Sequence, residues 1–285
     1  MKAAAFDYVK PKSLQQAITL LNQHGDDCRL LAGGQTLMAT LNMRLSEPQW
    51  VIDITGLEEL RGISLQGGVL RLGALVTHTE IELSGLVAQH APLLTTAAPH
   101  IAHRAIRNSG TWGGSIAYAD PAAEWPACFL ALGGTVIAAS PQGQRRIDAD
   151  AFFTGLYATA LQPNEILVAC EIPIASESHW FGFDELARRH GDYAIVGMAA
   201  SAERQGAALK DMRIVLMGAD AKPTRATQTE QFLNGKALDA ATIDQAVKVL
   251  CQEADPLPDL TNSPETKRHL AGVLLKRLLL QASSH

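Results

Sequence analysis

The sequence contains no apolar run long enough to cross a membrane, which would need about 18 consecutive apolar residues. The first residues also lack a secretory apolar segment, since Asp7 interrupts the short apolar stretch there. A basic surplus is missing too, because 24 Lys and Arg face 29 Asp and Glu, for a net charge of −5. Nucleic acid attracts basic surfaces, so it is a poor match for this chain. We therefore expect a cytoplasmic protein with no membrane span and no nucleic-acid partner.

Cysteine is scarce and scattered. The four cysteines are Cys28, Cys128, Cys170 and Cys251, and no two of them form a C-x-x-C pair. This spacing argues against a metal cluster and against a disulfide framework, and it favours small core residues. His100 and His103 are three residues apart, but no further cluster of ligands accompanies them. We therefore expect no metal site in this chain.

Three common site signatures are also missing. The chain has no G-x-G-x-x-G, no G-x-x-x-x-G-K-[ST] and no G-x-S-x-G. These absences exclude the Rossmann dinucleotide fingerprint, the P-loop and the nucleophile elbow of many hydrolases.

Two short glycine motifs are the most informative feature that is present. The first consists of Ala32, Gly33, Gly34, Gln35 and Thr36, and the second of Thr111, Trp112, Gly113, Gly114 and Ser115. The first follows an apolar run at residues 29–31 and precedes a helix-like stretch at residues 37–41. Glycine lets backbone N–H groups converge on an anion, because no Cβ stands in the way. Two such loops predict a phosphate-bearing ligand held from two sides, although two tight turns in a β-rich domain would give the same pattern.

The remaining pattern predicts a mixed chain of helices and strands. Ser13 followed by Gln16 predicts a helix start that runs to Gly25, and the glycines at 67 and 68 predict a hairpin. Further strands are expected at residues 50–54, 166–172, 194–203 and 211–218. Thr242 is expected to cap one helix and Ser263, followed by proline, another. The sequence pattern changes near residue 176, which predicts a domain boundary there, with a smaller unit of three strands and helices after it.

The chain resembles the medium, FAD-binding subunit of the molybdenum hydroxylases, the group that includes xanthine dehydrogenase and carbon monoxide dehydrogenase. The resemblance runs nearly end to end. Its most specific element is the pair of Gly-Gly motifs with Arg107 ahead of the second. Other shared stretches are residues 6–8, 11–13, 51–54, 106–108, 120–121 with Glu124, 163–167, 191–194 and 263–268.

This resemblance implies an α+β fold with a two-subdomain FAD-binding domain of the vanillyl-alcohol oxidase type, also called the p-cresol methylhydroxylase (PCMH) type. That domain would span residues 1–176, with subdomains at about 1–55 and 56–176. A smaller C-terminal α/β domain of the CO dehydrogenase flavoprotein type would span residues 177–285.

The resemblance also implies which residues contact FAD. Residues 32–36 would wrap the pyrophosphate, and residues 111–115 would contact the pyrophosphate and the ribityl region. Glu124 would contact the flavin moiety, and Tyr193 would lie against the isoalloxazine ring, where an aromatic face suits a flat π-system. Ile101 completes the expected set together with Arg107, which would either stabilise phosphate or anchor the loop.

Some residues depart from the family pattern or have plainer interpretations. Trp112 stands where a small or branched aliphatic residue is usual, and it would tighten the loop or adjust the exposure of the flavin. Ser115 replaces a common asparagine or aspartate. Neither change removes a backbone donor, so FAD binding should survive both. The residues alone also allow Glu124 as a surface carboxylate beside a proline turn, and Tyr193 as a half-buried strand tyrosine.

The implied function is that of an oxidoreductase subunit that carries electrons and hydroxylates no substrate itself. A large partner subunit would hold the molybdenum cofactor, and a small partner subunit would hold two [2Fe-2S] clusters. FAD in this chain would pass electrons to an external acceptor, and the assembly would be a dimer of heterotrimers. The alternatives are a stand-alone FAD-dependent oxidase or dehydrogenase, for which no histidine or tyrosine cluster marks a base, and an interaction subunit that has lost FAD.

Overall fold

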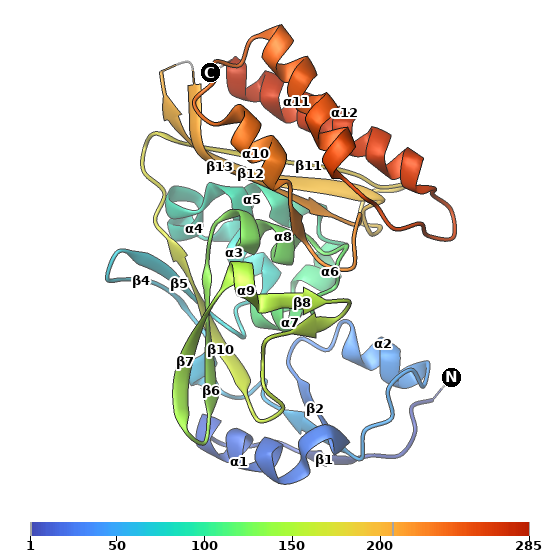
Figure 1. Ribbon diagram of the computed structural model, residues 1–285. Helices are drawn as coiled ribbons and strands as arrows, with labels where there is room; N and C mark the ends of the chain where they lie inside the picture. Colours follow the sequence, from blue (N-terminus) through green and yellow to red (C-terminus); the bar gives the residue numbers. More distant parts are fainter. Residues whose placement is uncertain (1, 207, 285) are drawn as a thin grey trace.

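The computed structural model describes residues 2–206 and 208–284, which form three stacked parts (Figure 1). The first part, blue in Figure 1, is built on a parallel sheet with strand order β1-β3-β2. Its elements are β1 (Asp7–Val9), α1 (Leu14–His24), η1 (Gly25–Asp27), β2 (Cys28–Leu31), α2 (Leu37–Asn42), β3 (Trp50–Asp53) and η2 (Glu58–Leu60). The predicted start of α1 is confirmed, because Ser13 Oγ accepts a hydrogen bond from the Gln16 N–H at 3.2 Å.

The second part contains an antiparallel sheet of five strands in the order β4-β5-β10-β6-β7. Its strands are β4 (Ile63–Gln66), β5 (Val69–Gly73), β6 (Thr135–Ser140), β7 (Gly143–Asp148) and β10 (Ile166–Pro173). The predicted hairpin is confirmed, since Gly67 and Gly68 join β4 to β5 with φ angles of 55° and 83°. Only glycine adopts such angles without strain.

This five-stranded sheet is covered on both faces. Along β6, Val136 and Ala138 face a core formed with the helices of the second part, whereas Ile137 and Ala139 face the core of the first part. The alternation follows from the two-residue period of a strand. The other elements of the second part are α3 (His78–Leu83), α4 (Gly85–His90), α5 (Pro92–Ala97), η3 (Ala98–His100), α6 (Arg104–Arg107), α7 (Trp112–Tyr118), α8 (Glu124–Ala131), α9 (Ala149–Phe152), β8 (Phe153–Gly155) and β9 (Ala158–Thr159).

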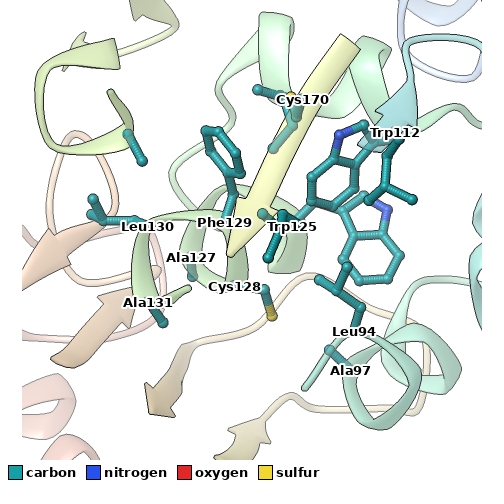
Figure 2. Close-up of a cluster of buried hydrophobic side chains, with 14 of the residues drawn as sticks. Leu94, Ala97, Trp112, Trp125, Ala127, Cys128, Phe129, Leu130, Ala131 and Cys170 are labelled. Carbon is teal, nitrogen blue, oxygen red and sulfur yellow. The ribbon is translucent and has the colours of Figure 1, made fainter. Parts of the chain in front are cut away.

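Trp112 belongs to the larger core, where Figure 2 shows it beside Trp125. It is fully buried, and its ring packs against Trp125 at 5.5 Å and Phe129 at 5.9 Å between centroids. Cys128 and Cys170 are buried in the same cluster, as expected of small core residues. The side chain of Trp112 therefore packs into this core next to the second glycine motif.

The third part, orange and red in Figure 1, is an antiparallel sheet in the order β11-β12-β13-β14 with three helices on its outer face. Its elements are β11 (His179–Leu186), β12 (Val196–Gln205), β13 (Ala208–Met217), β14 (Thr224–Arg225), α10 (Thr227–Leu233), α11 (Ala240–Glu253) and α12 (Pro264–Ser283). Helices α5 and α8 of the second part pack on the inner face of this sheet. None of the helices in the described ranges is both long and apolar enough to cross a membrane.

Two predictions for the third part were wrong. The sheet has four strands and not three: residues 194–203 and 211–218 correspond to β12 and β13, whereas no strand was expected at β11 or β14. Gly182 and the polar residues of β11 hide its strand pattern. Helix α11 begins earlier than expected, since Asp239 is its N-cap and accepts a hydrogen bond from the Thr242 N–H at 2.7 Å. The Ser263 cap of α12 is confirmed.

Candidate functional site

The first glycine motif lies at the edge where the parallel strands of the first part end. Strand β2 ends at Leu31, and residues 32–36 lead from it into α2. Strand β3 ends beside it at Asp53, whose carboxylate accepts hydrogen bonds from the Tyr8 hydroxyl and from the Thr55 N–H at 2.8 Å. In open α/β sheets, ligands bind outside the carboxyl ends of the strands. The predicted strand–loop–helix context of this motif is therefore confirmed.

The first motif leaves a row of backbone donors free. Within the described residues, the N–H groups of Gly33, Gly34, Gln35 and Thr36 donate to no acceptor of the chain. Gly34 has a φ of 71°, a conformation that side chains rarely adopt, and the Gln35 amide donates to the Gly33 carbonyl at 3.0 Å. Consecutive free N–H groups in such a turn form an anion-binding concavity. This loop fits a phosphate group.

The second motif is not the open loop that the sequence suggested. Thr111 is the N-cap of α7, and residues 112–118 are helical. Most donors of the motif are used internally: the Gly113 N–H donates to the Ala74 carbonyl at 2.9 Å, and the Gly114 N–H to Thr111 Oγ1 at 3.2 Å. The expectation that both motifs present converging free N–H groups is therefore wrong for the second one, where the glycines serve close packing.

The two motifs nevertheless touch each other. A Cβ on Gly33 would overlap the Ser109 carbonyl oxygen and would stand 2.8 Å from the Gly110 Cα and 3.0 Å from the Thr111 backbone nitrogen. A Cβ on Gly113 would stand 2.6 Å from the Ala74 Cβ. Glycine at these positions allows the backbone of the second motif to pack directly against the first motif.

Arg107 is an anchor for the segment before α6. Its Nε lies 3.0 Å from Glu82 Oε2, and its Nη1 donates to the carbonyls of Ile101 at 3.0 Å and Ala102 at 3.2 Å. The side chain is only 10% exposed, so these contacts occupy most of its donors. Of the two roles left open for Arg107, this geometry favours anchoring. Ile101 itself is buried, with its carbonyl held by this guanidinium.

Glu124 lies in an acidic neighbourhood at the contact between the second and third parts. It begins α8, and burial raises its pKa to about 8, with further contributions from Glu185 and Asp120. His100 lies beside it, with Nδ1 3.4 Å from Glu185 Oε1, and its hydrogen bond to Glu185 raises the pKa of His100. Glu124 is therefore not the plain surface carboxylate that the sequence alone allowed.

Tyr193 lies on the exposed side of the same region. Its side chain is in the segment before β12 and is 65% exposed, so it is not a half-buried strand residue. Burial raises the pKa of Asp120, and a hydrogen bond from Tyr193 opposes this effect. Tyr118 and Tyr157 pair nearby at 5.1 Å between ring centroids. The structure thus groups Tyr193, Asp120 and Glu124 at one end of α7, and the glycine motifs at the other.

The comparisons with known proteins decide the family. The family described as "FAD binding domain in molybdopterin dehydrogenase" matches residues 4–175, and the "CO dehydrogenase flavoprotein C-terminal domain" matches residues 181–282. This chain belongs to the FAD-binding medium subunits of the molybdenum hydroxylases. The resemblance inferred from the motifs is confirmed.

Relatives of this flavoprotein subunit align with it over its full length. The nicotine 6-hydroxylase medium subunit of Paenarthrobacter nicotinovorans is 37% identical over 100% of this chain and 99% of its own length. A carbon monoxide dehydrogenase structure from Hydrogenophaga pseudoflava matches with a TM-score of 0.97 at 34% identity, over 100% of this chain and 99% of that one. Quinoline 2-oxidoreductase from Pseudomonas putida 86 matches with a TM-score of 0.94 at 38% identity and the same coverage. The predicted fold class is confirmed.

The sequence did not reveal how His78 supports the site in this flavoprotein subunit. His78 Nδ1 accepts a hydrogen bond from Trp125 Nε1 at 2.8 Å, which joins α3 to α8 beneath the second motif. Burial lowers the pKa of His78 to about 4, so the ring is neutral. A Cβ on Gly110 would stand 2.5 Å from its Nε2. No local pattern marks this pair, because 47 residues separate the two side chains.

Proposed function

We propose that this subunit is the electron-exit module of a molybdenum-containing hydroxylase or dehydrogenase. When bound, FAD would supply the redox chemistry that links one-electron donors to a two-electron acceptor, and this chain would position it. The electrons come from the [2Fe-2S] clusters of a small partner subunit, and a large partner subunit holds the molybdenum cofactor. The assembly is a dimer of heterotrimers. The names "medium subunit" and "medium chain" of the relatives support a place among larger and smaller partners.

The observation that carries this proposal is the row of free N–H groups at residues 33–36. They lie at the carboxyl edge of a parallel sheet, in the segment matched by the FAD-binding family. Hydrogen bonds from backbone N–H groups to a charged oxygen are stronger than those between neutral groups. This loop is the part of the chain that would hold the FAD pyrophosphate.

We assign the other expected FAD-contact residues proposed roles from their positions in the structure. Thr111, Gly113, Gly114 and Ser115 form the floor beneath the pyrophosphate, and the N–H of Thr111 and the hydroxyl of Ser115 supply its donors. Arg107 acts through Ile101 by holding its carbonyl. Tyr193 offers an aromatic face to the flavin ring, and Glu124 a carboxyl group. We also propose that the domain boundary lies near residue 176, between residues 1–176 and 177–285.

The test is to purify the subunit with whatever copurifies and to record its visible spectrum and its metal content. The expected result is flavin absorbance together with iron–sulfur absorbance and molybdenum. A stable flavoprotein without molybdenum or iron, bleached by an organic substrate in the absence of oxygen, would overturn the proposal in favour of a stand-alone oxidase. A preparation without flavin would overturn the FAD site itself.

A further inference from the structure

Tyr193 lies in the connection between β11 and β12, which spans residues 187–195. The strands fix both ends of this connection, because they pair along their length and the Ile195 N–H donates to the Leu186 carbonyl at 2.8 Å. The Tyr193 side chain is 65% exposed, so packing of the ring does little to fix where it lies. Its position therefore depends on what holds the middle of the connection.

Gly191 places the middle of this connection against a second segment of the chain. A Cβ on Gly191 would stand 3.0 Å from the Ala102 carbonyl oxygen, 3.1 Å from the Ala102 carbonyl carbon and 3.1 Å from His103 Cε1. These distances are shorter than an ordinary van der Waals contact, so the two backbones meet here with no room for a side chain. Gly191 also has a φ of 85°, which glycine adopts without strain. The connection therefore rests on Ala102 two residues before Tyr193.

Ala102 itself has an unusual backbone conformation. Its φ is 42°, in the left-handed region that residues with a side chain rarely adopt. Such a conformation persists only where the surrounding structure holds it. Arg107 does so here, because its Nη1 donates to the carbonyls of Ala102 at 3.2 Å and Ile101 at 3.0 Å. The guanidinium is held in turn by Glu82, whose Oε2 lies 3.0 Å from the Arg107 Nε. The Ala102 carbonyl oxygen thus accepts from Arg107 and lies next to Gly191.

A second contact fixes the same segment against β11. His100 Nδ1 lies 3.4 Å from Glu185 Oε1, and the imidazole packs edge-on against Phe183 at 5.1 Å between centroids. Glu185 is close to the end of β11, so this contact lies where the connection begins, whereas Gly191 lies near its middle. Residues 99–103, which we call the seat, therefore support the connection at two points.

We propose that Arg107 is a positioning residue for Tyr193. It acts through the carbonyl of Ala102, on which Gly191 rests. This inference rests on the proposed function in one respect, because a bound flavin ring is what the Tyr193 face would meet. Without the Arg107 donor, the carbonyl of Ala102 turns away and the middle of the connection loses its support. A rigidly placed aromatic side chain presents one flat face to a planar group, whereas a mobile one does not.

Fluorine NMR of the full chain without FAD is the first test. The chain has four tyrosines, so uniform labelling with fluorotyrosine gives four signals, and Tyr193→Phe identifies the one from Tyr193. Arg107→Met keeps the apolar stem of the side chain but removes its donors, and it should shift or broaden the Tyr193 signal. Gly191→Ala should do the same, because its Cβ would push the connection away from Ala102. Tyr8 belongs to β1 in the first part, so its signal should stay unchanged in both variants.

Gly235→Ala is the matched control for backbone strain. Gly235 has a φ of 75°, close to the 85° of Gly191, but a Cβ on it would meet nothing within 4 Å. This variant should leave the Tyr193 signal in place, whereas an equal shift in it would overturn the inference, because strain far from the seat would then be sufficient. An unchanged Tyr193 signal in a folded Arg107→Met or Gly191→Ala chain would also overturn it, with folding checked by circular dichroism. If one of these two variants does not fold, the other decides.

The fluorescence of bound flavin is the second test, on the chain loaded with FAD. A tyrosine in contact with a flavin ring quenches its emission, so Tyr193→Leu should raise the emission. Arg107→Met and Gly191→Ala should recover most of that rise, and Gly235→Ala none of it. Wild-type emission in both variants, with FAD bound, would overturn the inference and leave the proposed function intact.

Failure of the proposed function gives different results. A wild-type chain that binds no FAD would overturn the FAD site, and equal emission from Tyr193→Leu and the wild type would overturn the contact of Tyr193 with the ring. In either case the fluorine signals still decide whether Arg107 positions Tyr193.

Discussion

The Gly33→Ala substitution would disturb the close contact between the two glycine motifs and thereby test the proposed FAD site. The added Cβ would overlap the Ser109 carbonyl oxygen and stand 2.8 Å from the Gly110 Cα. Both atoms belong to backbone, so no flexible side chain can move aside, and the loop at residues 33–36 must shift. Gly33 does not have a positive φ, so the effect is steric and not conformational. We expect the free N–H groups of this loop to lose their alignment.

The magnitude follows from the donors that are displaced. A hydrogen bond to a charged group contributes about 1.5–3 kcal/mol. Misplacing two of the four donors would therefore weaken FAD binding by about 3–6 kcal/mol, which is about 10²- to 10⁴-fold in Kd. Overpacking itself should reduce the free energy of unfolding by about 1–3 kcal/mol, so the chain should remain folded.

The assay is titration of the FAD-free chain with FAD, followed by the quenching of flavin fluorescence, with a thermal melt of each variant. Gly85→Ala is the matched control, because a Cβ on Gly85 would meet nothing within 4 Å. It should bind FAD as the wild type does. A folded Gly33→Ala chain with a Kd within about threefold of the wild-type value would refute the reasoning, because a change that small is worth less than one hydrogen bond.

Substitutions at three further residues test the packing and hydrogen bonds around the site. Arg107→Ala should lower the free energy of unfolding by about 1–3 kcal/mol, because the carbonyls of Ile101 and Ala102 lose their donor and Glu82 keeps only its ion pair with Arg104 at 3.7 Å. Denaturant unfolding measures this loss, and a loss well under about 1 kcal/mol would contradict the anchoring role. Trp112→Ala should lower the free energy of unfolding by about 3–5 kcal/mol, because the ring is fully buried against Trp125. Trp112→Phe should lower it clearly less. Equal melting temperatures for the two variants would contradict a packing role for the Trp112 ring. Because the pKa of His78 falls from 6.5 in the unfolded chain to about 4 in the folded one, the unfolded state binds more protons at low pH. The free energy of unfolding should therefore fall by about 3 kcal/mol as the pH is lowered from 6.5 towards 4. His78→Gln should remove this part of the pH dependence of unfolding. An unchanged pH dependence in His78→Gln would contradict the burial of a neutral ring.

The sequence predicted the first glycine motif well because its signals are local. An apolar strand, two glycines and a helix start follow each other within a few residues, and the structure has β2, the loop and α2 in that order. The second motif misled the prediction for a physical reason. Glycine disfavours helix interiors, yet Gly113 and Gly114 stand in the first turn of α7 because only glycine fits against Ala74 and the Thr111 cap. Tertiary packing overrode the local preference.

Long-range pairs were beyond the reach of the sequence. His100 and Glu185 are 85 residues apart, and neither belongs to a recognisable motif, so their ion pair appears only once β11 is placed against η3. The same applies to Arg107: the sequence left open whether it stabilises phosphate or anchors the loop, and only the structure shows that its donors point to Glu82 and to the carbonyls of residues 101 and 102. Strand β11 was missed because its polar residues break the apolar pattern, and its pairing with β12 supplies the order that its own sequence does not.

The five-stranded sheet sets a limit on how a cofactor enters this protein. Ile137 and Ala139 belong to the core of the first part, and Val136 and Ala138 to the core of the second, so the two parts share one wall. Separating the two parts would expose one apolar face of this sheet to water, which is unfavourable over a whole sheet. If residues 32–36 hold FAD as proposed, we expect the cofactor to exchange by movement of this short loop and not by separation of the two parts. Its rate of release should follow the stiffness of that loop and not the rigidity of the fold.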